Sequence, residues 1–501
     1  MEYVIGLDIG TTSTKAIAFD VKGKIIAENQ IGYPILNPEP FHFEQDCGVI
    51  LQAVIDAIAY ITNTIAANKP QFKLSGVSFS SAMHSLIAVD KKGVPLTNCI
   101  IWADTRSRDY ADQIKNSAEG HDIYMQTGTP IHPMSPLCKL VWMKNHLQEV
   151  FFKAHKFISI KEYVFYRFFK KYVVDFSIAS ATGLFNIHTL KWHTPALELA
   201  GISREKLSIP VHATYLMIGV QQRFADLMGI EITTPFIVGA SDGCLANLGS
   251  SAIKPGDAAV TIGTSGAIRV IADQPKSDPK ERIFSYILTV DQYVLGGPVN
   301  NGGVILRWFR DNFAGLEVQE ALKQGIDPYD ILTKEASLVE AGAEGLLFLP
   351  YLLGERAPHW NANAKGTFFG IQMQHTQAHF VRALLEGIIF GIYSVGKALE
   401  ETTGEIKTIY VNGGFVRSSL WVQILCDVFN KKVIVTESFE SSALGAAVVG
   451  MKALGFIASI EEVDKMVPTL EIYTPNAPNH HVYMKSFAVF ERLYEKLKDE
   501  F

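Results

Sequence analysis

A chain of 501 residues is too long for a single hydrophobic core, and its length predicts roughly two to four domains. The net charge of −6, with lysines and arginines spread along the sequence, argues against a nucleic-acid-binding face or a polybasic membrane surface and favours small-molecule partners. The five cysteines are scattered and include no C-x-x-C pair, which predicts a protein without disulfides or a zinc site. The chain shows no leader pattern at its start and no apolar run long enough to span a membrane, so we expect a soluble cytoplasmic protein.

The chain opens with two apolar strands around a short polar turn. Val4 to Leu7 lead into the turn, and Ala16 to Phe19 lead out of it. Backbone N–H groups at such a tip can bind an anion, and a nucleotide phosphate is the natural candidate. Hydroxyl donors come from Thr11, Thr12 and Ser13, and Asp8 suits a hard cation. An ordinary glycine-containing hairpin is the alternative at this point.

Helices and strands alternate after this turn. Apolar residues recurring from Ile50 to Ile65 predict a helix capped by Asp46, and short strands are predicted at 74–79, 85–89 and 98–102. This mixture indicates the α/β class.

Two polar groups lie in loops next to these strands. They are Met83 with His84, and Trp102 with Asp104 and Arg106. An aromatic ring, a carboxylate and an arginine so close together suit a polyol, although each residue alone is more often structural.

A less regular middle segment, 105–235, contains predicted helices at 137–147 and 160–169 and is interpreted as insertions in the first domain. A buried strand at 235–238 then leads to Asp242. At the end of such a strand, near a domain boundary, this carboxylate is the strongest candidate for a general base, the alternative being a structural Asp-Gly turn. The predicted domains are 1–247 and 248–501.

The opening pattern recurs directly after that boundary. Residues 258–270 again form an apolar strand, a small polar tip with Gly263 and Thr264, and a second apolar strand. The tips lie 253 positions apart, close to half the chain, so the sequence predicts a duplicated architecture of two domains.

The second half alternates between helices at 377–401, 418–430 and 441–454 and strands at 408–411 and 432–435. Gly413 and Gly414 follow a strand, where ligands bind in folds of this kind. The only near match to a P-loop, Gly391 to Ala398, lies in a helical pattern and has alanine where magnesium needs a hydroxyl, so it is rejected.

With these features in place, the sequence resembles the FGGY carbohydrate kinases of the actin, hexokinase and Hsp70 superfamily over nearly its whole length. Met134 to His146 is similar to the first signature of that family, and Gly366 to Glu386 to the second. The resemblance implies two ribonuclease-H-like domains with an active-site cleft between them.

The resemblance also implies roles for individual residues. Asp242 takes the place of the catalytic base, and Asp8 and Asp242 would hold Mg²⁺. The places that hold ATP are taken by Thr11, Thr12, Gly263, Thr264, Gly303, Gly414 and Ser418. The substrate-binding set is Met83, His84, Asp104, Arg106 and Asp242. Lys15 is left out of the catalytic set, because a basic residue two positions past a tip is expected to be a solvated strand residue.

Within the family, the segments 79–85, 102–107, 127–134 and 296–303 are most similar to bacterial gluconate kinases. Glycerol kinases have an Arg-Glu pair where this chain has Met83 and His84, and xylulose kinases typically have glycine where it has Ser85. The expectation is ATP- and Mg²⁺-dependent phosphorylation of D-gluconate, with Arg106, His84 or His132 near the substrate carboxylate.

Three alternatives stay open, as does a homodimer. They are a xylulose kinase or other pentulose or polyol kinase of the family, a nucleotide switch like actin or Hsp70 that acts on a protein partner, and a catalytically silent sugar sensor.

Overall fold

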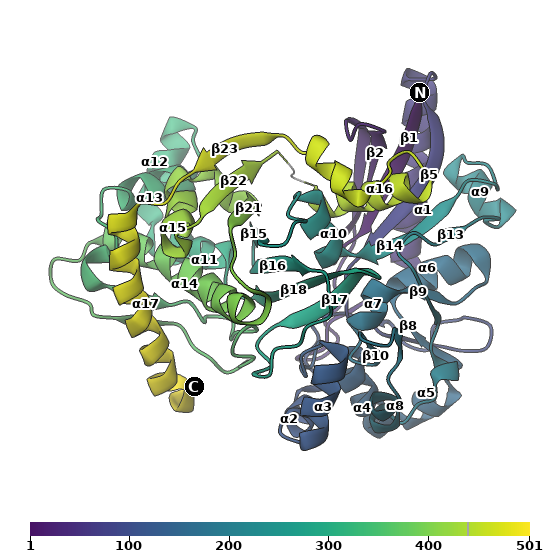
Figure 1. Cartoon of the computed structure of the whole chain (residues 1–501), viewed down its shortest axis with the longest axis horizontal. Helices are drawn as coiled ribbons and strands as arrows, with labels where there is room; N and C mark the ends of the chain where they lie inside the picture. The colour runs from purple at the N-terminus through teal and green to yellow at the C-terminus, as the bar shows by residue number, and fades with distance from the viewer. Residues whose placement is uncertain (438–439) are drawn as a thin grey trace. The chain divides into compact units, whose positions relative to one another are not determined.

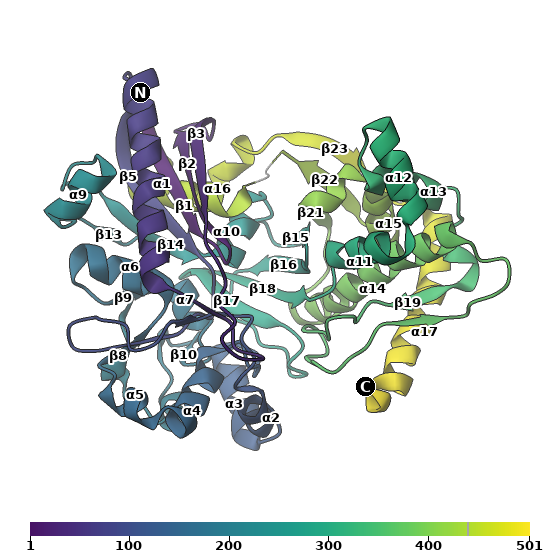
Figure 2. The same ribbon diagram turned by 180° about the vertical axis from the view of Figure 1, so that it is seen from behind.

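The structure, a computed structural model, describes residues 1–437 and 440–501 and divides the chain into two compact units. Unit 1 comprises Met1–Ile253, Ala272–Val294 and Glu440–Pro468, and unit 2 comprises Lys254–Ile271, Leu295–Phe439 and Thr469–Phe501. Figures 1 and 2 show the chain from opposite sides, with strands and helices mixed along its whole length. The predicted α/β class is confirmed.

The central sheet of unit 1 has six strands in the order β13-β14-β5-β1-β2-β3. Their bounds are β1 Glu2–Ile9, β2 Ser13–Asp20, β3 Ile25–Gly32, β5 Lys73–Ser81, β13 Leu216–Met217 and β14 Phe236–Ser241. β1 pairs antiparallel with β2 and parallel with β5, and β14 pairs parallel with β5. The predicted opening hairpin therefore forms the middle of this sheet.

A helix covers each face of this sheet, α1 (Cys47–Asn68) one face and α16 (Ser441–Ala453) the other (Figures 1 and 2). Tyr3, Ile5 and Leu7 of β1 belong to the core that α1 completes, whereas Gly6, which points the opposite way, contacts α16. Asp46 caps α1 as predicted, since its Oδ1 accepts the N–H groups of Gly48 and Val49 at 2.7 and 3.0 Å.

A second sheet, built mainly from strands of unit 2, repeats this arrangement. Its strands follow the order β17-β18-β16-β15-β21-β22-β23, with β15 antiparallel to β16 and parallel to β21. β22 is parallel to β21, as β14 is parallel to β5 in unit 1. β23 is antiparallel to β22, as β13 is antiparallel to β14. The bounds are β15 Asp257–Ile262, β16 Gly266–Ala272, β17 Phe284–Thr289, β18 Gln292–Val299, β21 Thr408–Asn412, β22 Lys432–Thr436 and β23 Thr469–Tyr473. The predicted duplication is thus present in the strand order itself.

Short elements fill the middle of unit 1. They are β4 Glu44–Gln45, β6 Ile87–Val89, β7 Cys99–Ile100, α2 Arg108–Lys115, α3 Ala118–Thr127, α4 Pro136–His146, α5 Gln148–Lys153, β8 Lys156–Ile158, α6 Ile160–Phe169, β9 Val173–Asp175, α7 Phe176–Ser180, β10 Phe185–Asn186, β11 Lys191–Trp192, α8 Thr194–Ala200, β12 Ile209–Val211, α9 Gln222–Met228 and α10 Asp242–Gly249. The helices predicted at 137–147 and 160–169 are confirmed within one residue as α4 and α6. The strands predicted at 85–89 and 98–102 are shorter, because β6 pairs with β8 over three residues and β7 with β4 over two.

Helices dominate the remainder of unit 2. They are α11 Gly303–Phe313, α12 Gly315–Gln324, α13 Pro328–Ala336, α14 Gln377–Thr403, α15 Ser419–Phe429 and α17 Ala477–Leu497, with the short strands β19 Leu347–Leu349 and β20 Thr367–Phe369. By length and composition α1 and α14 could cross a membrane, but 56% and 72% of their apolar windows are buried inside the protein. Both helices belong to the cores of their units.

The compact units are not consecutive halves of the chain. Glu440–Pro468, which includes α16, belongs to unit 1 although it lies far along the sequence. The division into 1–247 and 248–501 stays a prediction about sequence domains.

Glycines allow α16 to pack closely on two of its neighbours in unit 1, β1 and α10. A Cβ on Gly6 of β1 would lie 2.0 Å from the carbonyl oxygen of Ala443, and one on Gly445 would lie 2.1 Å from that of Leu245 in α10. No side chain fits at either contact, so glycine is required for α16 to hold β1 and α10 together.

We expect Gly445→Ala to destabilise unit 1 by about 1–3 kcal/mol, because the added methyl forces two helix backbones apart. The matched control is Gly391→Ala in α14, whose Cβ would meet only Pro350 Cγ at 3.8 Å. Alanine generally favours a helix over glycine, so this control should leave the midpoint of thermal unfolding unchanged or raise it. Equal midpoints for the two variants would contradict the packing argument.

Candidate active site

The tip of the β1–β2 hairpin has bonded carbonyl groups and two N–H groups without an acceptor among the described residues. Tyr33 donates its hydroxyl to Gly10 O at 2.7 Å and its N–H to Thr12 O at 3.0 Å, and Gln45 Nε2 donates to Thr11 O at 2.5 Å. Within residues 1–437 and 440–501, no group accepts the N–H of Thr11 or Thr12. Adjacent unbonded N–H groups at a turn form an anion-binding concavity.

Side chains fix this tip from two directions. Trp102 Nε1 donates to Thr11 Oγ1 at 2.8 Å, and Gln30 Nε2 donates to Ser13 Oγ at 2.8 Å. The Thr11 hydroxyl therefore accepts from the indole and keeps its own proton for an acceptor such as a phosphate oxygen.

The carbonyl groups at the tip of the β15–β16 hairpin of unit 2 are also hydrogen-bonded. Gly303 N–H donates to Gly263 O at 2.7 Å, and Gly302 N–H donates to Thr264 O at 3.3 Å. The N–H groups of Thr264 and Ser265 find no acceptor in the described part of the chain. A Cβ on Gly303 would lie 2.8 Å from Gly263 O, so glycine lets the start of α11 support this tip.

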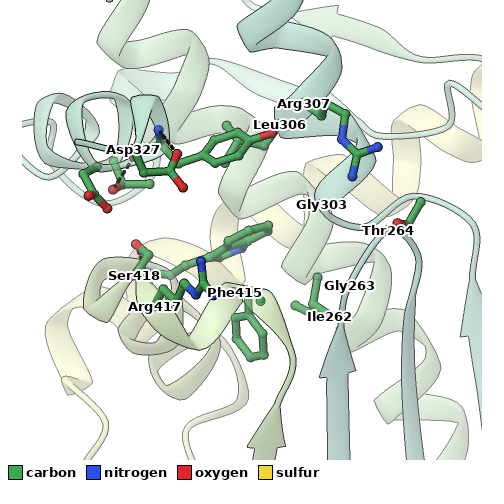
Figure 3. A pocket seen from close by; sticks show the side chains of 15 residues that line it. Ile262, Gly263, Thr264, Gly303, Leu306, Arg307, Asp327, Phe415, Arg417 and Ser418 are labelled. Atoms are coloured by element: carbon green, nitrogen blue, oxygen red, sulfur yellow. Dashed lines mark hydrogen bonds between the residues drawn. The ribbon is translucent and has the colours of Figure 1, made fainter. Parts of the chain in front are cut away.

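A cavity of about 300 Å³ in unit 2 opens beside this second tip (Figure 3). Hairpin β15–β16, α11, α13, α15 and the turn Gly414–Arg417 line it. Five residues predicted to bind nucleotide meet in its wall, namely Gly263, Thr264, Gly303, Gly414 and Ser418. The volume lies at the lower end of the range for ligand pockets.

Charged side chains line this cavity on both sides. Arg307 lies near Thr264 and Gly303, whereas Asp327, Arg417 and Ser418 lie on the other side (Figure 3). A ligand with an anionic end fits with that end toward Arg307 and the free N–H groups, and with hydroxyl or amino donors toward the carboxylate. Arg307 and Asp327 carry no sequence signal of their own, since only the packing of α11 and α13 brings them to the cavity.

Asp8, near the end of β1, is the candidate metal ligand of unit 1. Ser80 donates its hydroxyl to Asp8 Oδ1 at 2.6 Å. Burial raises the pKa of Asp8 and Glu440 adds to the rise, while the Ser80 hydrogen bond, Lys15 and Lys161 act against it. A buried carboxylate that is costly to ionise fits a site where a cation supplies the missing charge. No cluster of three or more His, Cys, Asp or Glu suited to a metal occurs among the described residues.

Lys15 is not the solvated strand residue that the sequence suggested. Its Nζ lies 2.5 Å from Glu440 Oε1, just before α16, and both side chains are only partly exposed. Lys15 and Glu440 lie far apart in the sequence, so no local sequence pattern predicts this ion pair.

Asp242 is the first residue of α10 and follows β14 directly. The pairing of β14 with β5 is irregular between Ile237 and Ala240, and Gly239 in between has φ +68°. A Cβ on Gly239 would lie 1.7 Å from Phe79 O, so only glycine permits this irregularity, which redirects the end of the strand. Gly243 N–H donates to Asp242 Oδ1 at 2.7 Å.

A buried ion pair supports the strand end before Asp242, which sequence reasoning missed. Lys161 Nζ lies 2.6 Å from Asp175 Oδ2 and donates to Ala240 O at 2.9 Å, with both side chains almost fully buried. Ser177 of α7 donates to Ser241 Oγ at 2.8 Å and accepts Ser241 N–H at 3.1 Å. The adjacent charged residues Lys161 and Glu162 near the start of α6 were the available sequence signal.

His84 has an unusual backbone. Its φ is +66°, its ring Nδ1 lies 2.8 Å from Ala181 O, and its side chain is buried next to Met83 in the loop after β5. Left-handed conformations of non-glycine residues collect at functional sites, where tertiary contacts hold them.

Asp104 and Arg106 bind each other. Arg106 Nε lies 2.9 Å from each Asp104 carboxylate oxygen, and Arg106 Nη2 lies 2.6 Å from Glu44 Oε1. The guanidinium also packs over Trp142, with only 4% of the side chain exposed. These contacts organise the loop around Trp102, and direct contact of either residue with substrate stays a prediction.

Comparisons with known proteins connect these features to a family. The model of the FGGY family of carbohydrate kinases, N-terminal domain, matches residues 3–249, and that of the C-terminal domain matches residues 258–454. The chain belongs to the FGGY family of carbohydrate kinases. The resemblance inferred from the signatures is confirmed, as is the two-domain FGGY fold with its likeness to actin and hexokinase.

Among curated FGGY relatives, the chain is 49% identical to a gluconokinase of Bacillus licheniformis, covering 100% of this chain and 97% of the relative. It is 29% identical to a xylulose kinase of Bacillus subtilis (strain 168), covering 100% and 98%. Two solved structures from Lactobacillus acidophilus, a ligand-bound xylulose kinase and a gluconate kinase, each match with a TM-score of 0.93 at 36% identity. They cover 99% of this chain and 99% and 98% of their own.

We expect the double variant Lys161→Met, Asp175→Asn to lower kcat about tenfold or more, because Ala240 O loses its donor and the strand end before Asp242 is held less firmly. Removing both charges avoids an uncompensated buried ion, so the protein should fold. The matched control removes the exposed pair of Lys397 and Glu491, which lie 2.7 Å apart, and should keep the kcat of the unmodified protein. Equal kcat values for both double variants would contradict the positioning role.

Proposed function

We propose that this FGGY kinase transfers the γ-phosphoryl group of ATP to the primary hydroxyl of D-gluconate, giving 6-phospho-D-gluconate. The observation that carries the choice of substrate is the 49% identity to a gluconokinase along the whole chain, against 29% for a xylulose kinase. A xylulose or related pentulose kinase is the second candidate, supported by the equal likeness to the two solved structures.

Asp242 is the proposed general base. Its carboxylate accepts the proton of the attacking hydroxyl as the oxygen bonds to the γ-phosphorus and the bond from that phosphorus to the ADP oxygen breaks. The hydrogen bond from Gly243 and the position at the N-terminus of α10 support this role, because they hold one carboxylate oxygen in place.

The two hairpins are the proposed phosphate-binding elements. Phosphate oxygens are the proposed acceptors of the unbonded N–H groups of Thr11, Thr12, Thr264 and Ser265. Because these N–H groups are already in place, they can stabilise the charge of the phosphates without reorganising. The cavity of unit 2 is the proposed site for the rest of ATP, with Gly303, Gly414 and Ser418 in its wall.

Mg²⁺ fits the buried, hydrogen-bonded carboxylate of Asp8, with Asp242 as a further ligand. When bound, it would neutralise charge on the phosphates during transfer.

Met83 and His84 are the proposed contacts for the polyol chain. The gluconate carboxylate requires a cationic or donor-rich partner. Arg106 is already shared between Asp104 and Glu44, and His84 and His132 are the other proposed partners for this carboxylate.

The test of the function is ADP release by the purified protein with ATP, Mg²⁺ and one substrate at a time from D-gluconate, D-xylulose, D-ribulose and glycerol. We expect the highest kcat/KM with gluconate and phosphorylation at its primary hydroxyl, checked by mass spectrometry and NMR. A higher kcat/KM with xylulose would favour the second candidate. Failure of all four to stimulate ADP release would overturn the proposal.

We expect Asp242→Asn to lower kcat by about 10²–10⁴-fold, because the hydroxyl loses its proton acceptor. The midpoint of thermal unfolding and the affinity for ADP, measured by calorimetry, should change little, since asparagine keeps the size of the side chain. A kcat within tenfold of the unmodified value would show that Asp242 is not the base.

A further inference from the structure

One buried ammonium group connects the two loops that carry the proposed sugar-binding residues of unit 1. Lys139 of α4 is completely buried, and its Nζ donates to His84 O at 2.6 Å and to Ile101 O at 2.8 Å. A longer contact of 3.4 Å reaches Ile100 O. His84 lies in the loop after β5, and Ile100 and Ile101 lead to Trp102.

Burying a lysine without an ion pair is unusual and calls for an explanation. Within the described residues, no carboxylate lies within salt-bridge distance of Lys139, and its partners are backbone carbonyl groups. An apolar side chain of similar length would fill this place without the loss of hydration. We therefore attribute the buried charge to the backbone carbonyl groups that it binds.

What Lys139 holds includes a strained residue. His84 adopts φ +66°, which is uncommon for a residue with a side chain, and it is fixed at two points. Lys139 binds its carbonyl oxygen, and Ala181 O lies 2.8 Å from its ring Nδ1. Together these contacts set both the backbone and the ring of His84.

We propose that Lys139 is a positioning residue for the sugar acid, whose protonated ammonium fixes the loop of Met83 and His84 against the loop of Trp102 and Asp104. This inference rests on the proposed function of these loops. Lys139 acts through their backbones and does not touch the substrate. Its loss should therefore raise KM for gluconate while leaving KM for ATP unchanged.

The chemistry of the amine supplies a second, independent consequence. Burial lowers the pKa of Lys139 to about 7, against the opposing effects of Asp104 and the thiols of Cys99 and Cys138, while Arg106 lowers it further. An ammonium has three N–H donors for the three carbonyls, whereas the neutral amine has two, so deprotonation releases at least one contact.

A rise in pH is expected to weaken gluconate binding through Lys139, but it affects the stability of the fold in the opposite direction. The pKa of a lysine in the unfolded chain is about 10.4, so between pH 7 and 10 the unfolded state binds more protons than the folded one. This group therefore makes the fold more stable as the pH rises. A loss of gluconate affinity above pH 7 cannot come from unfolding driven by Lys139.

The experiment measures KM for gluconate and for ATP between pH 6 and 9 for the unmodified protein, Lys139→Met and Lys139→Arg. For the unmodified protein we expect KM for gluconate to rise about fivefold to tenfold above pH 7, with KM for ATP unchanged. Lys139→Met should show the high KM at every pH, and Lys139→Arg, which stays charged, should show a flat profile.

The matched control is the double variant Lys161→Met, Asp175→Asn. It removes another buried lysine of unit 1, and it should lower kcat rather than raise KM for gluconate. Thermal unfolding of each variant identifies any that do not fold, and the profile of the unmodified protein tests the inference without a variant.

Three results would overturn the inference. They are a flat profile of KM for gluconate in the unmodified protein, an unchanged KM for gluconate in folded Lys139→Met, or a pH dependence that persists in Lys139→Arg and so belongs to His84 or His132. Absence of gluconate-dependent ADP release from the unmodified protein at every pH would instead refute the proposed function.

Discussion

The hydrogen bonds to the carbonyl groups of the two hairpin tips are the constraint on which the rest of the structure depends. Successive N–H groups of a turn can bind an anion, and hydrogen bonds to the carbonyl oxygens of the same turn hold these N–H groups in place. In unit 1 the donors are Tyr33 and Gln45, and in unit 2 they are the first residues of α11. Each unit thus builds an anion site by placing donors behind a hairpin.

The same sheet order around each hairpin serves different purposes in the two units. In unit 2, α11, α13 and α15 leave a cavity beside the tip, with Arg307 and Asp327 on opposite sides. In unit 1, α16 packs on β1 and α10 through glycines, and α10 begins with Asp242. Duplication accounts for the shared sheet, and the elements packed on each sheet account for the difference in chemistry.

Several buried charges of unit 1 lie next to the proposed acid–base and sugar-binding residues. Lys161 and Asp175 hold the strand end before Asp242, and Arg106 is held by Asp104 and Glu44. A buried ion pair adds little net stability compared with an apolar pair of similar volume, but removing one partner is strongly destabilising. Such pairs are suited to fixing backbone geometry, which proton transfer and polyol binding require.

The sequence by itself determined the features whose signals are local. The two hairpins, the Asp46 cap of α1, the periodic helices α6 and α14 and the signatures of the family follow from residues close together in the chain. Only the tertiary structure decided that α16 packs in unit 1, that Lys15 pairs with Glu440, that Arg106 is shared by two carboxylates, and that Lys161 and Lys139 support the site. These contacts join residues far apart in sequence, and a hydrogen bond or ion pair of that kind leaves no periodic pattern along the chain.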